Sequence, residues 1–598
     1  MNPSLDRYSD VLEGMFNIEP QEGPSRVMTA NEAVRKFVRP GMALHTLITH
    51  AFPYALINEV TRQFWKKDPG FTLLALGAVN QALVFLRGGM LKRIISSYCG
   101  DVYPAPGPNP NINQAYLDGR VKIENWTVLT FSQRMLAGAL GLVGLPTRSL
   151  TGSTMAEDNR DAFVRIPDPF GEGETGFLKA LRPDLSLVHG WVADAAGNVL
   201  FSPPLSENLW GAVGAREGAV VSVEKIVDTD FIRQNAHLAR LPAQYVRAVV
   251  ELPFGAHPGG FFGRPIRDCR SYAEDYDFIV NFRNQNRDPD NFDAWIREWI
   301  LDCRNHEDYL KKLGPSHLAD LIAKGRPDSW EDELALLSGR VSDDPAAVPT
   351  EIMTVHAAHR LVDRCREKGY RAILAGQGIS NLAAWLANYL LKRQEVEVDL
   401  VAETGFFGYA PRPGNPFLFN FANIPRCKML TDSLMGLGAV VGGAASNCIG
   451  SLSAGQVDKF GNVNSTLIPG VYYIVGSGGA CDVLCTAGEV VLTAQLLPMR
   501  YVDQVPYITG PGRRVSTVVC DQGVFEKPPG HEELMLTALV QDGDKSKQDV
   551  VEGIKGLLGW EPKVAADPDW VELPTKEELT AIRILDPRRA FLKLPKED

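Results

Sequence analysis

The stretch "RAILAGQGISNLAAWLANYLLKR" at residues 371–393 reads as a strand, a short loop and a helix. Its opening "RAILAG" is almost wholly apolar, as in a strand that a parallel sheet buries on both faces. A helical pattern, "EIMTVHAAHRLVDRCREKG" (351–369), precedes it, and another apolar strand follows near residue 398. Helices that alternate with short apolar strands predict a parallel sheet covered by helices on both faces.

The same alternation occurs nearer the N-terminus. A helix is predicted from Thr29, because Glu32 stands three residues after this capping threonine. Strands are then expected at 42–49, 71–77 and 91–98, with a helix at 54–66 between the first two. One long helix is expected at 290–313. The predicted fold class is α/β, with two related open, mainly parallel-sheet domains in tandem.

The domain boundaries follow from changes in composition. Residues 1–25 are polar and turn-rich and are expected to form an N-terminal extension, and 26–323 the first domain. Residues 324–349 are rich in acids, Pro and Gly, which is typical of an interdomain linker. The second domain is expected at 350–598.

Each half contains an apolar strand that runs into the pattern Asp-x-x-Gly-Asn-Val. The members are Asp194, Gly197, Asn198 and Val199 in the first half and Asp458, Gly461, Asn462 and Val463 in the second. A single match of this kind arises by chance, or because these residues suit hairpin turns. Since both halves also open on helix, turn and strand, we favour duplication of one α/β unit.

Composition limits the function classes. The chain has 598 residues, 45% of them apolar and 22% charged, with a net charge of −11. This balance disfavours nucleic-acid and anionic-membrane partners. The nine cysteines are scattered without zinc-site spacing, no His cluster indicates a metal, and no secretion signal or bilayer-length apolar segment is visible. We expect a cytoplasmic protein with free thiols and neither metal nor permanently bound cofactor.

Glu403 is the first candidate for chemistry. In "VEVDLVAETGFFGYAP" (396–411), acids alternate with apolar residues, so Glu403 could be a solvated acid on a strand, like Glu397 and Asp399. Against this, it stands at the carboxyl end of a strand, where open parallel sheets hold their ligands. The local sequence leaves both interpretations open.

Two further stretches are candidates for function. Gly476, Gly478 and Gly479, followed by Ala480, form either a tight turn or a loop whose backbone N–H groups bind an anion or oxyanion. His257, in "PFGAHPGGFFG" (253–263), is interpreted as a lone packing residue of a loop.

Taken together, these stretches resemble class I CoA-transferases. Residues 26–322 resemble the α subunit of glutaconate CoA-transferase, through "SRVMTANEAVRKFV", "GLVGLPTRSL", "GAHP" and "FDAWIREWILDCRNHEDYLKKLG". Residues 350–590 resemble the β subunit, through "AETGFFGYAP", "DKFGNVNST" and "GSGGA". The order indicates a fusion of both subunits in one chain.

The resemblance implies that Glu403 is the nucleophile of a ping-pong CoA transfer from an acyl-CoA to a carboxylic acid, through a mixed anhydride and a glutamyl-CoA thioester. Coenzyme A would be substrate, and the fused chains would form a dimer. The segment 43–53, "ALHTLITHAFP", lacks the glycines usual after the first strand of the α part. We therefore expect a bulkier or more apolar acid, in a pocket formed by Phe406, Phe407, Tyr409 and His50.

Two alternative functions stay open beside transfer. One is an acyl-CoA or ring-opening hydrolase of the same superfamily, which would use a glutamate in the α part. The stretch 126–143 contains no acid, whereas Glu403 is present, and both facts favour transfer. The other is a non-catalytic CoA-binding effector protein, which the retention of Glu403 beside a glycine loop disfavours.

Overall fold

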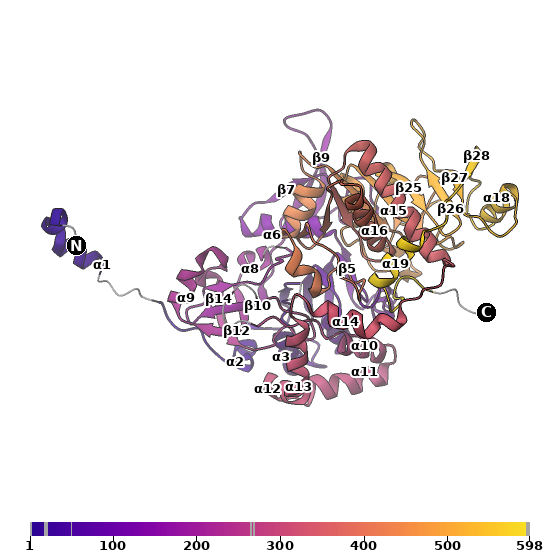
Figure 1. Cartoon of the computed structure of the whole chain (residues 1–598). Coiled ribbons are helices and arrows are strands. Elements are labelled where there is room, and N and C mark those ends of the chain that lie inside the picture. Colours follow the sequence, from indigo (N-terminus) through magenta and orange to yellow (C-terminus); the bar gives the residue numbers. More distant parts are fainter. Residues whose placement is uncertain are drawn as a thin grey trace.

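Two mainly parallel sheets, one in each half of the chain, make up the body of the protein (Figure 1). The structure is a computed structural model and describes residues 3–16, 22–48, 51–207, 209–263, 266 and 270–593. The expected α/β class with two sheet domains in tandem is confirmed.

The first sheet has seven parallel strands in the order β14-β12-β10-β1-β2-β4-β6, and β11 and β13 add antiparallel pairs beside β10. The bounds are β1 Ala43–Thr46, β2 Phe71–Ala75, β4 Leu91–Ser96, β6 Lys122–Asn125, β10 Leu185–Asp194, β11 Val199–Leu200, β12 Ala219–Val227, β13 Ala239–Leu241 and β14 Val246–Glu251. All ten residues of β10 are buried, as expected for a strand that helices cover on both faces.

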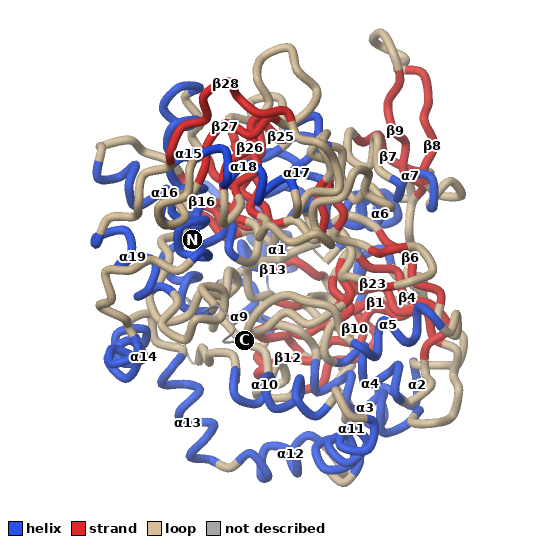
Figure 2. The backbone as a smooth tube through the Cα atoms, turned by 90° about the vertical axis from the view of Figure 1, so that its right-hand side faces the viewer, coloured by secondary structure: helices blue, strands red, loops and turns tan. Residues whose placement is uncertain are grey.

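Helices and smaller sheets complete this half. The helices are α2 Ala30–Phe37, α3 Tyr54–Phe64, α4 Gln81–Arg87, α5 Pro110–Leu117, α6 Val128–Ala139, α7 Thr154–Asp158, α8 Trp210–Gly214, α9 Thr229–Gln234, α10 Tyr276–Gln285, α11 Pro289–Ile296, α12 His306–Leu313 and α13 Pro315–Lys324. The short parallel pair β3 Gly77–Ala78 and β5 Tyr98–Cys99 extends the carboxyl edge of the sheet. The strands β7 Gly144–Thr147, β8 Phe163–Pro167 and β9 Glu174–Lys179 form a separate sheet, whose β8–β9 hairpin projects from the body in both Figures 1 and 2.

The second sheet runs β18-β17-β16-β15-β19-β24-β25-β26-β27-β28, with β16 to β25 parallel. The bounds are β15 Ala372–Ala375, β16 Asp399–Ala402, β17 Phe406–Phe407, β18 Met429–Leu430, β19 Cys448–Ser453, β24 Glu489–Thr493, β25 Val515–Val519, β26 Gly523–Glu526, β27 Met535–Leu539 and β28 Lys563–Trp570. The helices are α14 Ser329–Leu337, α15 Pro349–Lys368, α16 Ile379–Arg393, α17 Ala480–Thr486, α18 Lys547–Lys555 and α19 Lys576–Leu585. One hydrophobic cluster contains buried residues of both halves, among them Leu83, Trp126, Leu437 and Leu492, so the sheets share a core.

The two Asp-x-x-Gly-Asn-Val turns have the same geometry. The backbone N–H of Asn198 donates to Asp194 Oδ1 at 2.8 Å, and that of Asn462 donates to Asp458 Oδ1 at 3.0 Å. In both turns the asparagine Nδ2 donates to the second carboxylate oxygen, and the glycine has a positive φ. Since each turn also packs against the first residue of the equivalent strand, β14 or β25, the structure supports the duplication.

Two local expectations can be compared with the structure. The capping box is present, because Thr29 N donates to Glu32 Oε2 at 2.9 Å and Glu32 N to Thr29 Oγ1 at 3.2 Å. The prediction of a single long helix at 290–313 is wrong. A π-helical segment, Arg297–Leu301, follows α11, and α12 begins as a separate helix after Asn305. The Asn305 side chain accepts the N–H of Asp308 at 2.9 Å, which makes it a helix cap.

The predicted linker contains the helix α14. Trp330 of this helix lies 5.5 Å beneath the Arg412 guanidinium, and Glu333 pairs with Arg588 at 2.6 Å, so α14 contacts the second half. At the other end of the chain, α1 Ser9–Phe16 has no buried residue and stands away from the body in Figure 1.

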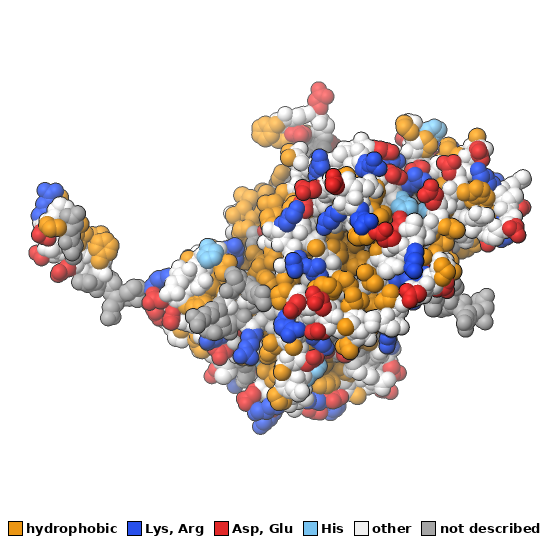
Figure 3. Space-filling model, viewed as in Figure 1, with side chains coloured by type: hydrophobic (Ala, Val, Ile, Leu, Met, Phe, Trp, Pro, Cys, Tyr) orange, Lys and Arg blue, Asp and Glu red, His pale blue; other side chains and the backbone are white. Residues whose placement is uncertain are grey.

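Surface and helix composition bear on the expected partners. Basic and acidic side chains are intermixed over the face shown in Figure 3. Among the described residues, none of the helices combines the length and the apolar character needed to cross a bilayer.

Candidate active site

Glu403 lies at the carboxyl edge of the second sheet. β16 ends at Ala402, and the chain turns back at once into β17, which pairs Ala402 with Phe406. Gly405 makes this turn possible, because its φ is +111° and a Cβ there would collide with the carbonyl oxygen of Thr431. Glu403 therefore lies beyond the strand and off the face that carries Asp399, which pairs with Lys428 at 2.7 Å.

The glycine loop approaches this carboxylate through one backbone group. Gly479 N donates to Glu403 Oε2 at 2.8 Å. A Cβ at position 479 would overlap that oxygen, so only glycine allows the approach. The N–H groups of Gly476, Gly478 and Ala480 donate instead to the carbonyls of Ser465, Ser97 and Ser477, which narrows the oxyanion-donor hypothesis to Gly479.

The first half of the chain holds the glycine loop in place. Gly478 N donates to Ser97 O at 2.9 Å, and Gly478 O accepts the N–H of Val128 at 3.1 Å. Cys99 N donates to Val475 O at 2.7 Å. Because Ser97 and Cys99 follow β4 and Val128 begins α6, the carboxyl edges of the two sheets meet around Glu403.

Burial sets the charge state of this site. Glu403 keeps some solvent exposure, but protein surrounds its carboxyl group, and this burial raises its pKa from 4.5 to about 7. The N–H of Gly479 partly offsets the shift, while the nearby Asp482 adds to it. Asp482 accepts Leu129 N at 3.0 Å and Ser149 Oγ at 2.5 Å, and burial raises its pKa to about 6.

A cavity of about 280 Å³ opens between the halves next to this site. Leu129, which donates to Asp482, lies in its wall together with Gln133 and Arg148 of the first half. The second half contributes Gly438, one residue beyond Leu437, whose Cδ1 would lie 3.3 Å from a Cβ at position 479. The side-chain oxygen of Gln133 has no hydrogen-bond partner among the described residues.

The aromatic residues after Glu403 lie mainly in the core. Phe406 and Tyr409 are buried in one hydrophobic cluster, and the Tyr409 hydroxyl accepts the indole N–H of Trp385 at 2.9 Å. Phe407 is half-buried and packs against the other cluster. Core packing corrects the expectation that Phe406 and Tyr409 form a pocket wall, and His50 lies outside the described residues.

A buried contact between a histidine and a glutamate in the first half was not anticipated from the sequence. His45 of β1 faces Glu207, with Nε2 and Oε1 3.0 Å apart, and its Nδ1 lies 2.7 Å from Ser186 Oγ. The other carboxylate oxygen of Glu207 has no partner among the described residues. Ser206, next to Glu207, forms a bridge with Asp432, so the pair lies close to the junction of the halves.

His257 is not the lone histidine that the sequence indicated. Its Nε2 lies 3.1 Å from Asp275 Oδ2, and His317 Nε2 lies 2.5 Å from the same oxygen. Burial lowers the pKa of His257. Positions 257, 275 and 317 have no regular spacing, so no sequence motif marks this cluster.

Comparison with known proteins finds similarity to two kinds of CoA-transferase subunit. The family model described as coenzyme A transferase matches residues 27–252. The chain is 27% identical over 324 residues to the A subunit of glutaconate CoA-transferase from Acidaminococcus fermentans, covering 50% of this chain and 94% of that one. It is also similar to both subunits of 3-oxoadipate CoA-transferase from Pseudomonas knackmussii. The chain is 29% identical to the A subunit, covering 48% of this chain and 98% of that subunit. It is 28% identical to the B subunit, covering 40% of this chain and 94% of that subunit.

A solved structure shares the fold of nearly the whole chain. An acyl-CoA transferase from E. coli O157:H7, in a thioester complex with CoA, superimposes with a TM-score of 0.61 at 15% identity, covering 96% of this chain and 98% of that one. The resemblance to the two kinds of CoA-transferase subunit, each over about half of this chain, is confirmed.

Proposed function

We propose that this chain, a relative of the CoA-transferases with regions similar to their A and B subunits in tandem, moves CoA from a donor acyl-CoA to an acceptor carboxylic acid. Glu403 is the nucleophile. The observation that supports this assignment is the bond from Gly479 N to Glu403 Oε2, at the place where the carboxyl edges of both sheets meet.

The reaction proceeds in two symmetrical halves. A Glu403 oxygen attacks the thioester carbonyl of the donor, the C–S bond breaks, and a mixed anhydride and CoA thiolate form. The thiolate then attacks the glutamyl carbonyl carbon, the anhydride C–O bond breaks, and the donor acid leaves as a carboxylate. The acceptor carboxylate attacks the resulting glutamyl thioester, and the same steps in reverse release the new acyl-CoA and Glu403.

Burial of Glu403 favours this chemistry. A pKa raised from 4.5 to about 7 means that the carboxylate is destabilised by about 3 kcal/mol relative to water. Both covalent intermediates are neutral at the glutamyl group, so their formation relieves that penalty. At neutral pH a substantial fraction of Glu403 is still ionised and able to attack.

Gly479 is positioned to stabilise charge in the second step. When the thiolate attacks the glutamyl carbon, negative charge develops on a Glu403 oxygen, and the Gly479 N–H already donates to one of them. A donor fixed before the charge develops needs no reorganisation, which is the basis of oxyanion stabilisation.

The surroundings support transfer more than hydrolysis. A hydrolase needs a group that activates water, and Asp482 is the neighbouring acid that raises the pKa of Glu403. Its two oxygens accept Leu129 N and Ser149 Oγ, so it is already engaged. The cavity of about 280 Å³, with Arg148 and the unpartnered oxygen of Gln133, offers space and polar contacts for part of a substrate.

Mass spectrometry of the protein incubated with an acyl-CoA tests the proposal. We expect a CoA adduct on a peptide that contains Glu403, and loss of both adduct and turnover in Glu403→Ala. Glu397→Ala is the matched control, because Glu397 is an acid of the same segment, six residues earlier. Turnover by Glu403→Ala at the wild-type rate would refute the assignment.

Two further expectations belong to the proposal. The eight described cysteines are all free thiols, and we expect the protein to act in a reducing cytoplasm. We also expect two chains to associate, which light scattering coupled to size-exclusion chromatography measures directly.

A further inference from the structure

Three potential metal ligands converge at one edge of the first half. His257 follows β14, Asp275 is the N-cap of α10, and His317 lies on α13. One ligand atom of each, two imidazole nitrogens and a carboxylate oxygen, lies within 4.8 Å of the others. None of these residues takes part in the proposed CoA transfer.

Their surroundings orient these atoms toward a common point. Asp275 Oδ1 accepts the N–H of Phe278 at 3.0 Å as helix cap, which directs Oδ2 toward both imidazoles. His257 Nδ1 lies 2.6 Å from the Tyr309 hydroxyl, so the ring is fixed with Nε2 facing Asp275. A histidine whose second nitrogen is held by another group is the usual arrangement of a metal ligand.

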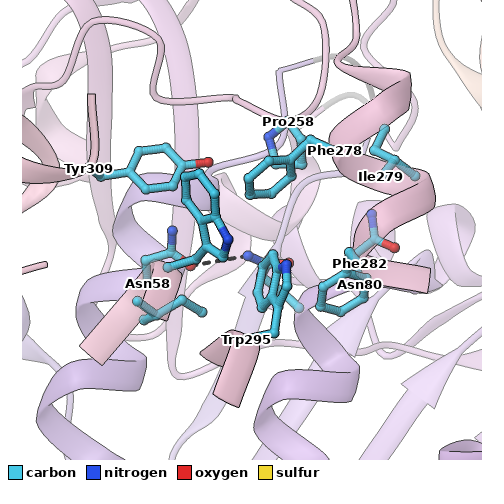
Figure 4. Close-up of a pocket in the computed structure, with 11 residues that line it drawn as sticks. Asn58, Asn80, Pro258, Phe278, Ile279, Phe282, Trp295 and Tyr309 are labelled. Atoms are coloured by element: carbon cyan, nitrogen blue, oxygen red, sulfur yellow. Dashed lines mark hydrogen bonds between the residues drawn. The ribbon is translucent and has the colours of Figure 1, made fainter. Parts of the chain in front are cut away.

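The cluster has an open side that faces a cavity. Asp275 and His317 line this cavity, which has a volume of about 560 Å³. Figure 4 shows a smaller neighbouring pocket of about 10 Å³, lined by Tyr309, Phe278 and Trp295 next to Pro258, the residue after His257. A bound ion would thus be accessible to water or a small ligand from the cavity.

We propose that His257, Asp275 and His317 form a mononuclear site for a divalent transition-metal cation of the Zn²⁺ class. Two histidines and one carboxylate, with a further position open, are a ligand set that this class of ion prefers. Asp277 and Glu298, in the lining of the same cavity, add negative charge near the open side. The ion would join the loop after β14 to α10 and α13 and present a Lewis-acidic position to the cavity.

The distances between the ligand atoms can be compared with those of a metal site, since all three atoms lie within 4.8 Å of one another. Bonds of about 2.0–2.1 Å to a tetrahedral ion place ligand atoms about 3.3 Å apart. His257 Nε2 and Asp275 Oδ2 are already 3.1 Å apart. His317 Nε2, at 2.5 Å from that oxygen, must move out by less than about 1 Å, and its side chain is 38% exposed on the side that faces the cavity.

Zn²⁺ binding to chelator-treated full-length protein tests the site, by isothermal titration calorimetry and by metal analysis after desalting. We expect one Zn²⁺ per chain in the wild type and an affinity weaker by at least about 10–100-fold in His317→Ala. His359→Ala is the matched control: His359 also lies 2.5 Å from a carboxylate oxygen, of Glu578, and is 32% exposed, but it is outside the cluster.

Cobalt provides a second readout that is independent of activity. Co²⁺ in the site should give the visible absorption of a four-coordinate ion, absent in His317→Ala and retained in His359→Ala and Glu403→Ala. Equal Zn²⁺ binding by wild type and His317→Ala, or no binding by the wild type at micromolar Zn²⁺, would overturn the proposal. The three side chains would then form a hydrogen-bonded cluster only.

Discussion

Replacing Gly479 by alanine tests the geometry on which the proposed reaction depends. The added methyl group would overlap Glu403 Oε2 and lie 3.3 Å from Leu437 Cδ1. The φ of Gly479 is −86°, which any residue adopts, so the substitution introduces no backbone strain. Its effect should come from the displaced carboxylate alone.

The expected magnitude follows from the lost hydrogen bond. A hydrogen bond to a charged group contributes about 1.5–3 kcal/mol, so losing the Gly479 N–H should slow turnover at least about 10–100-fold. The same bond lowers the pKa of Glu403, so its loss should raise that pKa above about 7. Because the ionised form of Glu403 attacks, activity should increase as the pH rises through the pKa of Glu403. The variant should therefore reach its full activity at a higher pH than the wild type.

The assay is kcat/KM for acyl-CoA consumption, measured across the neutral and alkaline range for wild type and variant. Gly436→Ala is the control, because a Cβ there lies at ordinary contact distances of 3.6 Å from Ala402 O and 3.7 Å from Glu403 O. We expect the control to keep the wild-type profile. An unchanged pH profile in Gly479→Ala, or an equal loss in Gly436→Ala, would refute the reasoning.

Other substitutions test interactions elsewhere in the protein. Arg583→Ala would remove the guanidinium that binds both oxygens of the buried Glu351 at 2.8 Å and leave it only Arg589, 3.5 Å away, so the free energy of unfolding should fall by up to about 3–5 kcal/mol in urea titrations. Arg588→Ala removes a more exposed pair and should cost at most about 1 kcal/mol; similar losses would contradict this account. Gly197→Ala and Gly461→Ala should each lower the free energy of unfolding by about 1–3 kcal/mol, because both glycines have positive φ in equivalent turns. Wild-type stability in either variant would show that the turns are not equivalent.

Local sequence rules predicted the features that depend on neighbouring residues. The capping box of Thr29 and Glu32 needs only a threonine and a glutamate three residues apart, and it is present. The repeated Asp-x-x-Gly-Asn-Val turn likewise depends on bonds within five residues, Asp194 to Asn198 in the first half. Such interactions join residues that are close in the sequence, so the local pattern is enough to suggest them.

Features that depend on distant residues could not be predicted in this way. His257 reads as a lone residue in the sequence because its partners stand 18 and 60 positions away. The donors of the glycine loop were equally hidden, since Ser97 of the first half decides that Gly478 donates to a carbonyl. The aromatic side chains of Phe406 and Tyr409 suggested a pocket wall, but their packing in the structure shows that they fill the core.

The same dependence on distant residues explains why the first half matters to a nucleophile in the second. Ser97, Val128 and Leu129 hold Gly478 and Asp482 by hydrogen bonds that cross between the halves, and Gly479 lies between those two residues. If the halves separated, the loop would lose these bonds and Gly479 its fixed approach to Glu403. Joining the halves in one chain makes their contact intramolecular, so the site does not depend on the protein concentration. The proposed oxyanion donor is thus positioned by one half and used by the other.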